Sequence, residues 1–179
     1  MELGAATMHS PCRLLSSLLL CTVGCGYHTA GSATHIPAGV RTLAVPIFTT
    51  HAQSFHTEMA FTEAVIQELH TRTSYRLLNA AAADADATLT GVILSQTVAP
   101  LTYDASSGQT SSYLLTITAK VSLAARDGRL LYRNDALVLR EQYQSTQDLS
   151  GFIQEDAAAV RRVSRDFART TVSDMLEAF

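Results

Sequence analysis

The sequence contains no tryptophan, a single lysine (Lys120) and three cysteines. The cysteines (Cys12, Cys21 and Cys25) all lie near the N-terminus, so residues 26–179 contain no thiol for a disulfide, a zinc site or a nucleophile. A domain of this size buries about 70% of the surface that its unfolded chain exposes, so it folds without a disulfide or a metal.

The sequence also lacks recognisable catalytic motifs. It has no G-x-S-x-G nucleophile motif, no glycine-rich phosphate loop and no H-E-x-x-H metal motif. Asp84 and Asp86 alternate where a strand is expected to begin, and we interpret them as solvated side chains rather than an acid–base pair. His56 and His70 lie on one expected helix, about 21 Å apart along its axis, which is too far to share a metal. The sequence therefore predicts no catalytic residue, no cofactor and no metal site.

The charge balance excludes one large class of partners. The formal net charge is −3 at pH 7, whereas a general nucleic-acid-binding domain carries an excess of basic residues. After Cys25, no apolar run reaches the about 20 residues that a membrane-spanning helix needs. The sequence thus predicts neither nucleic-acid binding nor a transmembrane segment in the domain.

The N-terminal region resembles a bacterial lipoprotein signal peptide. Arg13 precedes the apolar run Leu14–Val23, and the small Gly24 stands before Cys25. In such signals the cysteine after the cleavage site receives acyl chains and becomes the mature N-terminus. The resemblance implies that Cys25 is lipidated and anchors the protein, because two or more acyl chains hold a protein stably on a membrane.

This interpretation divides the chain into three parts. Residues 1–24 are the lipoprotein signal peptide, residues 25–40 the lipidated N-terminus and a polar, Gly-rich tether, and residues 41–179 a single domain. Translation starts at either Met1 or Met8. The competing interpretation of the apolar run is a buried N-terminal helix.

Alternating apolar and polar residues predict the strands of the domain. The clearest alternation places Leu115, Ile117, Ala119, Val121 and Leu123 on one face. Asp127-Gly128 then predicts a tight hairpin turn, because this pair tolerates positive φ. The four predicted strands are residues 41–48, 88–98, 115–123 and 130–144, with a possible short strand near 76–79 and loops at 49–54 and 102–112.

In the first strand, Leu43, Val45 and Ile47 are expected on the buried face, and Pro46 indicates a sheet edge or a bulge. Two amphipathic helices complete the domain. The first covers residues 55–72 with Ser54 as N-cap, and its apolar stripe comprises Phe55, Met59, Val65, Ile66 and Leu69. The second runs from Asp148 or Ser150 nearly to Phe179, and its stripe comprises Ala157, Val160, Phe167, Ala168, Thr171, Val172, Met175 and Phe179.

The element order β-α-β-β-β-α predicts an α+β fold. Two helices pack on one face of a mostly antiparallel four-stranded sheet, so that both apolar stripes share one core.

Basic residues gather on the expected hairpin, where only Asp127 and Asp135 oppose them: Lys120, Arg126, Arg129, Arg133 and Arg140. Arginine binds phosphate or carboxylate groups through two parallel hydrogen bonds. The plainer interpretation is that these charges keep an exposed hairpin from aggregating. A second set at helical spacing, formed by Arg161, Arg165 and Arg169, is interpreted as a solvated helix face.

An ordered set of short motifs makes the chain resemble the LptE family of outer-membrane lipopolysaccharide-assembly lipoproteins. In chain order the motifs are CGYH at 25–28, AVPIF at 44–48, FTEAV at 61–65, ADATLTG at 85–91, P-x-x-Y at 100–103, the Asp127-Gly128 hairpin, Tyr143 and the C-terminal helix. Two positions depart from the family pattern. Thr22 replaces the usual leucine of the lipobox, and Thr49-Thr50 follows the first strand where many relatives have an asparagine.

The resemblance implies a function without catalysis. Family members sit at the inner leaflet of the outer membrane, plug the lumen of the large β-barrel LptD, help that barrel to assemble and help lipopolysaccharide to reach the cell surface. The implied partners are therefore an LptD-type barrel and lipopolysaccharide, with a lipid-anchored location on the periplasmic face of the outer membrane. Because lipid A carries phosphates, the five basic residues of the hairpin are candidate lipopolysaccharide contacts.

Two alternatives remain open at the level of sequence. The chain fits a lipid-anchored scaffold of another outer-membrane assembly, such as the barrel-folding machinery. A lipid-anchored periplasmic enzyme would instead need a concave site with convergent titratable groups.

Overall fold

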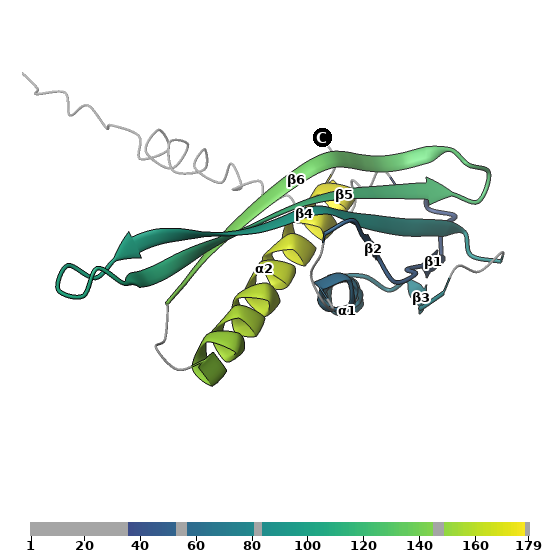
Figure 1. Cartoon of the computed structure of the whole chain (residues 1–179). Coiled ribbons are helices and arrows are strands. Elements are labelled where there is room, and N and C mark those ends of the chain that lie inside the picture. The colour runs from purple at the N-terminus through teal and green to yellow at the C-terminus, as the bar shows by residue number, and fades with distance from the viewer. Residues whose placement is uncertain (1–35, 53–56, 81–83, 145–148, 178–179) are drawn as a thin grey trace, which may run out of the picture. The chain divides into compact units, whose positions relative to one another are not determined.

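The computed structural model describes residues 36–52, 57–80, 84–144 and 149–177 (Figure 1). These residues form strands and helices in the following order: β1 (Thr42–Ala44), β2 (Thr49–Thr50), α1 (Thr57–Arg72), β3 (Arg76–Leu78), β4 (Ala87–Tyr103), β5 (Thr110–Ala125), β6 (Leu130–Gln144) and α2 (Leu149–Glu177).

The strands form one sheet in the order β3-β1-β4-β5-β6, and β2 also pairs with β4. The long strands β4, β5 and β6 are antiparallel, whereas β1 pairs in parallel with β3 and β4, and β2 in parallel with β4. The predicted α+β class is confirmed, but the predicted number of four strands is wrong. β3 pairs in parallel with β1 because α1 lies between them along the chain, and a helical crossover returns the chain in the same direction. The possible strand near residues 76–79 is β3.

Pro46 divides the predicted first strand into two. β1 ends at Ala44, and the chain rejoins the sheet as β2 only at Thr49, because proline has no N–H to donate to the ladder. Val45 and Phe48 are buried, but Ile47 is 61% exposed, so the prediction that Ile47 faces the core is wrong. Thr49–Thr50, predicted as loop, is the strand β2.

The hairpin of β4 and β5 is longer than predicted and projects beyond the helices (Figure 1). The expected loop at 102–112 shrinks to residues 104–109. At its tip the Asp104 carboxylate accepts hydrogen bonds from the backbone N–H groups of Ser106 and Ser107 at 3.1 and 2.8 Å, and from both hydroxyls. These bonds, that of the Ser106 hydroxyl first, hold the pKa of Asp104 well below its usual range.

The inward face of β5 matches the prediction in full. Its five predicted core residues have no exposed surface: Leu115, Ile117, Ala119, Val121 and Leu123. The turn into β6 is also confirmed, because Gly128 adopts the positive φ of 85° and its N–H donates to the carbonyl of Ala125 at 2.9 Å.

Both helices pack on the same face of the sheet, as predicted (Figure 1). In α1 the buried stripe is centred on Phe61, Val65 and Leu69, so Met59, which is 44% exposed, was wrongly placed in the core. In α2 the predicted core residues Phe167, Ala168, Thr171, Val172 and Met175 are buried, whereas Ala157 is exposed and Ala159 is buried in its stead. Ser54, Phe55, Asp148 and Phe179 lie outside the described residues.

Three phenylalanines join the sheet to the two helices. The Phe167 ring of α2 lies 4.8 Å from the Phe61 ring of α1 and 6.1 Å from the Phe48 ring, which it meets edge-on. The N–H of Phe48 donates to the buried Thr62 hydroxyl oxygen at 2.9 Å. A side chain on Gly91 of β4 would place its Cβ 2.4 Å from the Phe48 ring, so glycine leaves the space that this ring occupies.

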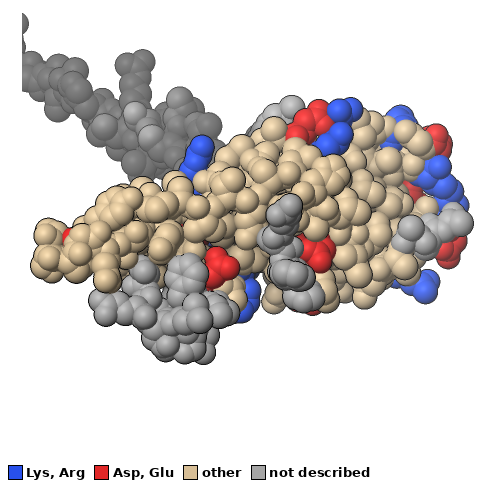
Figure 2. All heavy atoms as spheres, viewed as in Figure 1, with Lys and Arg blue, Asp and Glu red and all other residues tan. Residues whose placement is uncertain are grey.

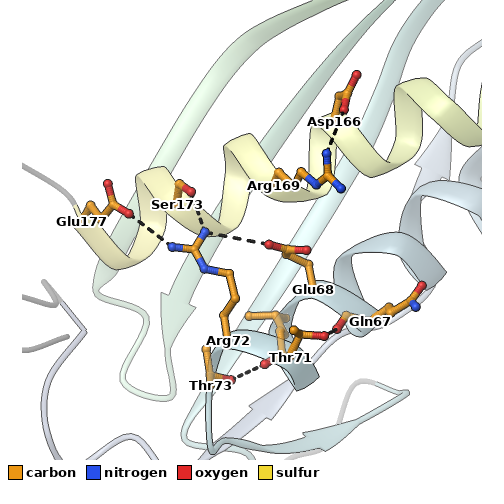
Figure 3. Close-up of polar contacts among 10 residues, drawn as sticks. Gln67, Glu68, Thr71, Arg72, Thr73, Asp166, Arg169, Ser173 and Glu177 are labelled. Atoms are coloured by element: carbon orange, nitrogen blue, oxygen red, sulfur yellow. Dashed lines mark hydrogen bonds and ion pairs between the residues drawn. The ribbon is translucent and has the colours of Figure 1, made fainter. Parts of the chain in front are cut away.

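At the surface, Arg72 links the C-terminal ends of the two helices (Figure 3). Its guanidinium contacts Glu177 of α2 at 3.2 Å and Glu68 of its own helix at 3.9 Å, and it donates to the Ser173 hydroxyl oxygen. Partly exposed pairs of this kind contribute little stability each, so the aromatic contacts dominate the helix–helix interface.

We predict that Gly91→Ala destabilises the domain by about 2 kcal/mol, because the Phe48 ring is buried between β4 and α2 and has no room to shift. Urea unfolding followed by circular dichroism measures the free energy of unfolding. Gly39→Ala is the control, because no atom lies within 4 Å of its added Cβ. Equal stability of the two variants would contradict the prediction.

Candidate functional site

The structure describes all five basic residues that the sequence nominated as lipopolysaccharide contacts: Lys120, Arg126, Arg129, Arg133 and Arg140. They lie on β5, on β6 and in the turn between these strands. Their surroundings differ enough to divide them into residues that hold the fold together and residues that are open to a ligand.

Lys120, Arg133 and Arg140 lie on the outer face of the sheet, away from the helices. Lys120 alternates with the buried residues of β5, and Arg133 and Arg140 stand opposite Ser122 and Thr116, which alternate in the same way. Directly opposed residues of an antiparallel pair share one face. Arg140 forms no salt bridge within the described part of the chain.

Asp135 holds two of these cations together. Its Oδ1 lies 2.7 Å from Arg133 Nε and 3.3 Å from Lys120 Nζ. The hydrogen bond from Arg133 is the main cause of the lowered pKa of Asp135, and it raises the pKa of Arg133 in turn. Both cations remain partly exposed, at 39% for Lys120 and 50% for Arg133, so an anion in solution has access to them.

Arg126 is committed to the fold. Its Nε donates to the carbonyl of Ala85 at 2.9 Å, and its Nη2 donates to the carbonyl of Asp84 and lies 3.3 Å from Asp86 Oδ1. These bonds connect the end of β5 to the segment that leads into β4. The guanidinium of Arg129 makes a 3.8 Å contact with Asp127, and the side chain is 63% exposed, so Arg129 is the more accessible arginine of the turn.

Asp86 is therefore part of a structural network, not a simple solvated side chain. Its Oδ2 accepts hydrogen bonds from the N–H groups of Arg41 and Thr42 at 3.0 and 2.9 Å, and from the Thr42 hydroxyl at 2.7 Å. The hydroxyl bond is the largest cause that lowers the pKa of Asp86 to about 2. Asp84, its neighbour in the sequence, is exposed.

A surface that the sequence analysis missed is the projecting part of the β4–β5 hairpin, residues 97–113, called the β4–β5 arm. Between residues 87 and 119 the only charged residue is Asp104. Figure 2 shows the arm almost free of charge, whereas charged groups gather at the opposite end of the molecule, where β5 turns into β6. Leu101 and Tyr103 expose 43% and 64% of their surface on the arm. Counting charges along the sequence would have revealed it.

Other features bear on the class of protein. Among the described residues, no group of three His, Cys, Asp or Glu side chains is placed to hold a metal ion. No helix in the described ranges has the length and apolarity to cross a membrane. Cys25, the predicted lipidation site, lies outside these ranges.

The fold matches solved structures of bacterial lipoproteins. Rare lipoprotein B from Shewanella oneidensis is 14% identical, with a TM-score of 0.52 over 73% of this chain and 92% of that one. Lipoprotein B from Nitrosomonas europaea is 12% identical, with a TM-score of 0.51 over 78% of this chain and 88% of that one. Identities this low show a shared fold alone. A search of curated proteins finds no match.

The chain thus has the α+β fold of these solved structures. Residues 40–175 match the family LptE, described as lipopolysaccharide-assembly. Since this match covers nearly all of the domain, the chain belongs to the LptE lipopolysaccharide-assembly family, and the resemblance inferred from the sequence motifs is confirmed.

We predict that Arg126→Ala lowers the free energy of unfolding by about 1 kcal/mol, because it removes the hydrogen bonds to Ala85, Asp84 and Asp86. Arg129→Ala is the matched control and should change stability by less than about 0.5 kcal/mol. Urea unfolding of both variants measures the difference. If the two variants lose the same stability, Arg126 has no special structural role.

Proposed function

We propose that the protein is an outer-membrane lipoprotein that plugs an LptD-type β-barrel, helps it to assemble and assists the transport of lipopolysaccharide to the cell surface. The observation that carries this proposal is membership of the LptE family over residues 40–175. The protein acts by occupying and supporting its partner and catalyses no reaction. Lipidation of Cys25 holds it on the periplasmic face of the outer membrane.

The β4–β5 arm is the surface best suited to contact the barrel. Burying a charged group against a protein wall is costly unless the charge is paired, and the single carboxylate of the arm already accepts four hydrogen bonds from Ser106 and Ser107. Leu101 and Tyr103 offer exposed apolar surface that gains free energy on burial. The arm therefore enters an interface at low desolvation cost.

The lipopolysaccharide contact falls on the accessible basic residues of β5, β6 and their turn. Arg129 and Arg140 carry the contact together with Arg133 and Lys120, which bracket Asp135. Phosphates of lipid A match the paired donors of a guanidinium group. Arg126 is better left out of a binding test, because its side chain supports the fold.

We predict that Leu101→Asp combined with Tyr103→Asp reduces recovery of the barrel partner on the order of tenfold, because two carboxylates must then be desolvated at the interface. The measurement is an affinity pull-down of C-terminally tagged protein from detergent-solubilised outer membrane, with quantitative mass spectrometry. Leu130→Asp is the control for a carboxylate placed on exposed apolar surface, because Leu130 is 50% exposed at the other end of the sheet.

The unmodified protein should recover a stoichiometric large barrel of the LptD type. Recovery of the general barrel-folding machinery in its place would favour the alternative function, a lipid-anchored scaffold of another outer-membrane assembly. Equal recovery by the arm variant and the Leu130 control would remove the arm from the interface.

We predict that replacing Arg129, Arg133 and Arg140 with Ser weakens lipopolysaccharide binding about tenfold, or about 1.4 kcal/mol, with an unchanged urea midpoint. The control variant replaces Arg161, Arg165 and Arg169 with Ser, which removes the same charge from exposed positions of α2. Binding is measured by titration with purified lipopolysaccharide at low and physiological salt, because screening weakens exposed charge contacts. Equal weakening in the two variants would mean that net charge alone governs binding.

A further inference from the structure

The sheet ends at β6, and the second half of this strand is an open edge (Figure 1). A bulge interrupts β6 where Asn134 and Leu137 stand opposite Val121 and Ala119 of β5. From Leu137 to Gln144 the strand then pairs with β5 without a break, and we call this stretch the β6 edge. An uninterrupted strand with one unpaired side is a template on which a further strand forms.

The backbone of β5 alternates between its two neighbouring strands. The N–H of Ala125 donates to the carbonyl of Arg129 on the side of β6, whereas the N–H of Arg126 donates to the carbonyl of Asp86 on the side of β4. Consecutive residues of a strand direct their N–H and C=O groups to opposite sides. The odd-numbered residues from 113 to 125 therefore bond to β6.

The pairing register carries this alternation onto the β6 edge. Odd-numbered residues of β5 stand opposite odd-numbered residues of the β6 edge, as Ile117 does opposite Leu139. The backbone groups of Val138, Arg140 and Gln142 therefore point away from β5. No other residue in the described part of the chain forms a backbone hydrogen bond with them. The β6 edge thus presents one N–H donor and one C=O acceptor at every second residue.

The side chains of the β6 edge favour an added strand. Val138 is 43% exposed on the outer face of the sheet, and Leu137 and Leu139 are partly buried against the core. A charge that points inward from an edge strand opposes further pairing. Glu141 points inward, but its carboxylate is bonded to Arg162 of α2, so the β6 edge carries no unpaired inward charge.

The other long open edge of the described sheet has protection that the β6 edge lacks. Beyond Ile93, β4 has no described partner strand on its second side. Pro100 stands opposite Tyr113 there, so the alternation turns it toward the open side, where it has no N–H to donate. A register shift also interrupts β4 between Pro100 and Thr102. Proline and bulges prevent strand addition, and the β6 edge contains neither.

The position of the β6 edge indicates which strand it pairs with. Its last residue, Gln144, stands opposite Ser112 of the β4–β5 arm, the surface that the proposed function directs into the barrel. A strand on the β6 edge therefore lies beside the same partner. The wall of a closed barrel has no free edge to offer, so the pairing segment is an extended loop of that partner.

A second copy of this chain fits the β6 edge less well. Antiparallel pairing of two β6 strands places Arg133 and Arg140 of both copies on one outer face. The Asp135 carboxylate of each copy is already shared between Arg133 and Lys120. Like charges that face each other destabilise a strand pair, so the occupant is a segment without a basic residue opposite Arg140.

We propose that the β6 edge binds an extended loop of the barrel partner as an added strand, through the backbone groups of Val138, Arg140 and Gln142. Main-chain hydrogen bonds supply the affinity, and a β-branched residue of the loop packs opposite Val138. The inference rests on the proposed function, because it names the segment of that partner. The added strand fixes the register of the domain along its partner, which the apolar contacts of the arm do not.

The test is a pull-down of the barrel from detergent-solubilised outer membrane with C-terminally tagged Val138→Pro protein. Proline removes one outward N–H and leaves the ladder with β5 in place, so we expect recovery of the barrel to fall about tenfold. Val138→Thr is the matched control, because it keeps the N–H and a β-branched side chain, and it should recover the barrel fully. Urea midpoints check folding, and Gln142→Pro with Gln142→Thr is a second pair on the same edge.

Hydrogen exchange provides a readout of the backbone itself. In the free protein the amides of Val138, Arg140 and Gln142 should exchange about tenfold faster than those of Leu137 and Leu139, which bond to β5. In the barrel-bound protein the three outward amides should slow about tenfold, because the added strand accepts their hydrogen bonds. Mass spectrometry with single-residue fragmentation measures both states.

Several results would overturn the proposal and leave the proposed function intact. They are full recovery of the barrel by proline variants with unchanged urea midpoints, an equal loss with Val138→Thr, and unchanged exchange of the outward amides in the bound protein. A dimer of the free protein that Val138→Pro dissociates would assign the β6 edge to a second copy instead. Failure of the proposed function looks different: the unmodified protein would then recover no barrel, and this inference would fail with it.

Discussion

The contact between Phe48 and Gly91 fixes how the sheet and the helices of this domain meet. The Phe48 ring occupies the space that a side chain on β4 would fill, and it meets Phe167 of α2 edge-on. The backbone of the same residue is bound to Thr62 of α1. Because one residue contacts both helices and the central strand, a change at Gly91 is transmitted to the whole interface. Tightly packed interiors have few voids into which a displaced ring can move.

The residues that form this contact lie in three of the short motifs that carry the family resemblance. The motifs AVPIF, FTEAV and ADATLTG contribute Phe48, Thr62 and Gly91. These motifs supply residues through which the helices pack on the sheet. They contain none of the basic residues and none of the arm residues to which we assign contacts. The 12–14% identity to solved lipoprotein structures is therefore compatible with one shared fold. Fold and function depend on different parts of this chain, and the function has to be tested at its surfaces.

How far the sequence could predict the structure depended on the length of each pattern. β5 and α2 repeat one period many times, so the buried face of β5 was predicted in full and that of α2 from Phe167 to Met175, whereas the buried Ala159, Val163 and Ser164 were missed. β1, β2 and β3 have two or three residues each, too few for a period, and tertiary pairing decides whether they form. Pro46 further moved Ile47 outward and Phe48 inward.

The candidate site was harder to predict, because the type of a residue does not show which other residue it contacts in the folded chain. Arg126 and Arg129 look alike beside the same turn, yet only Arg126 lies opposite Asp86, a residue 40 positions away along the chain. Residues 36–41 and 74–76 likewise line one pocket, and only the pairing of β1 with β3 brings them together.

Along the long strands β4 and β5, charge is distributed in a way that gives the proposed plug a direction. The arm has one carboxylate, satisfied by its own turn, so this end loses little hydration free energy when a protein wall encloses it. The other end carries the exposed guanidinium groups of Arg126 and Arg129 beside the turn from β5 to β6, and the Asp86 carboxylate there is already bonded to the start of β1 and to Arg126. Enclosing these guanidinium groups in an apolar environment would cost hydration free energy, whereas phosphates would attract them. Within the proposed function, desolvation cost and phosphate attraction favour one orientation, with the arm directed into the barrel and the end where β5 turns into β6 directed toward phosphates.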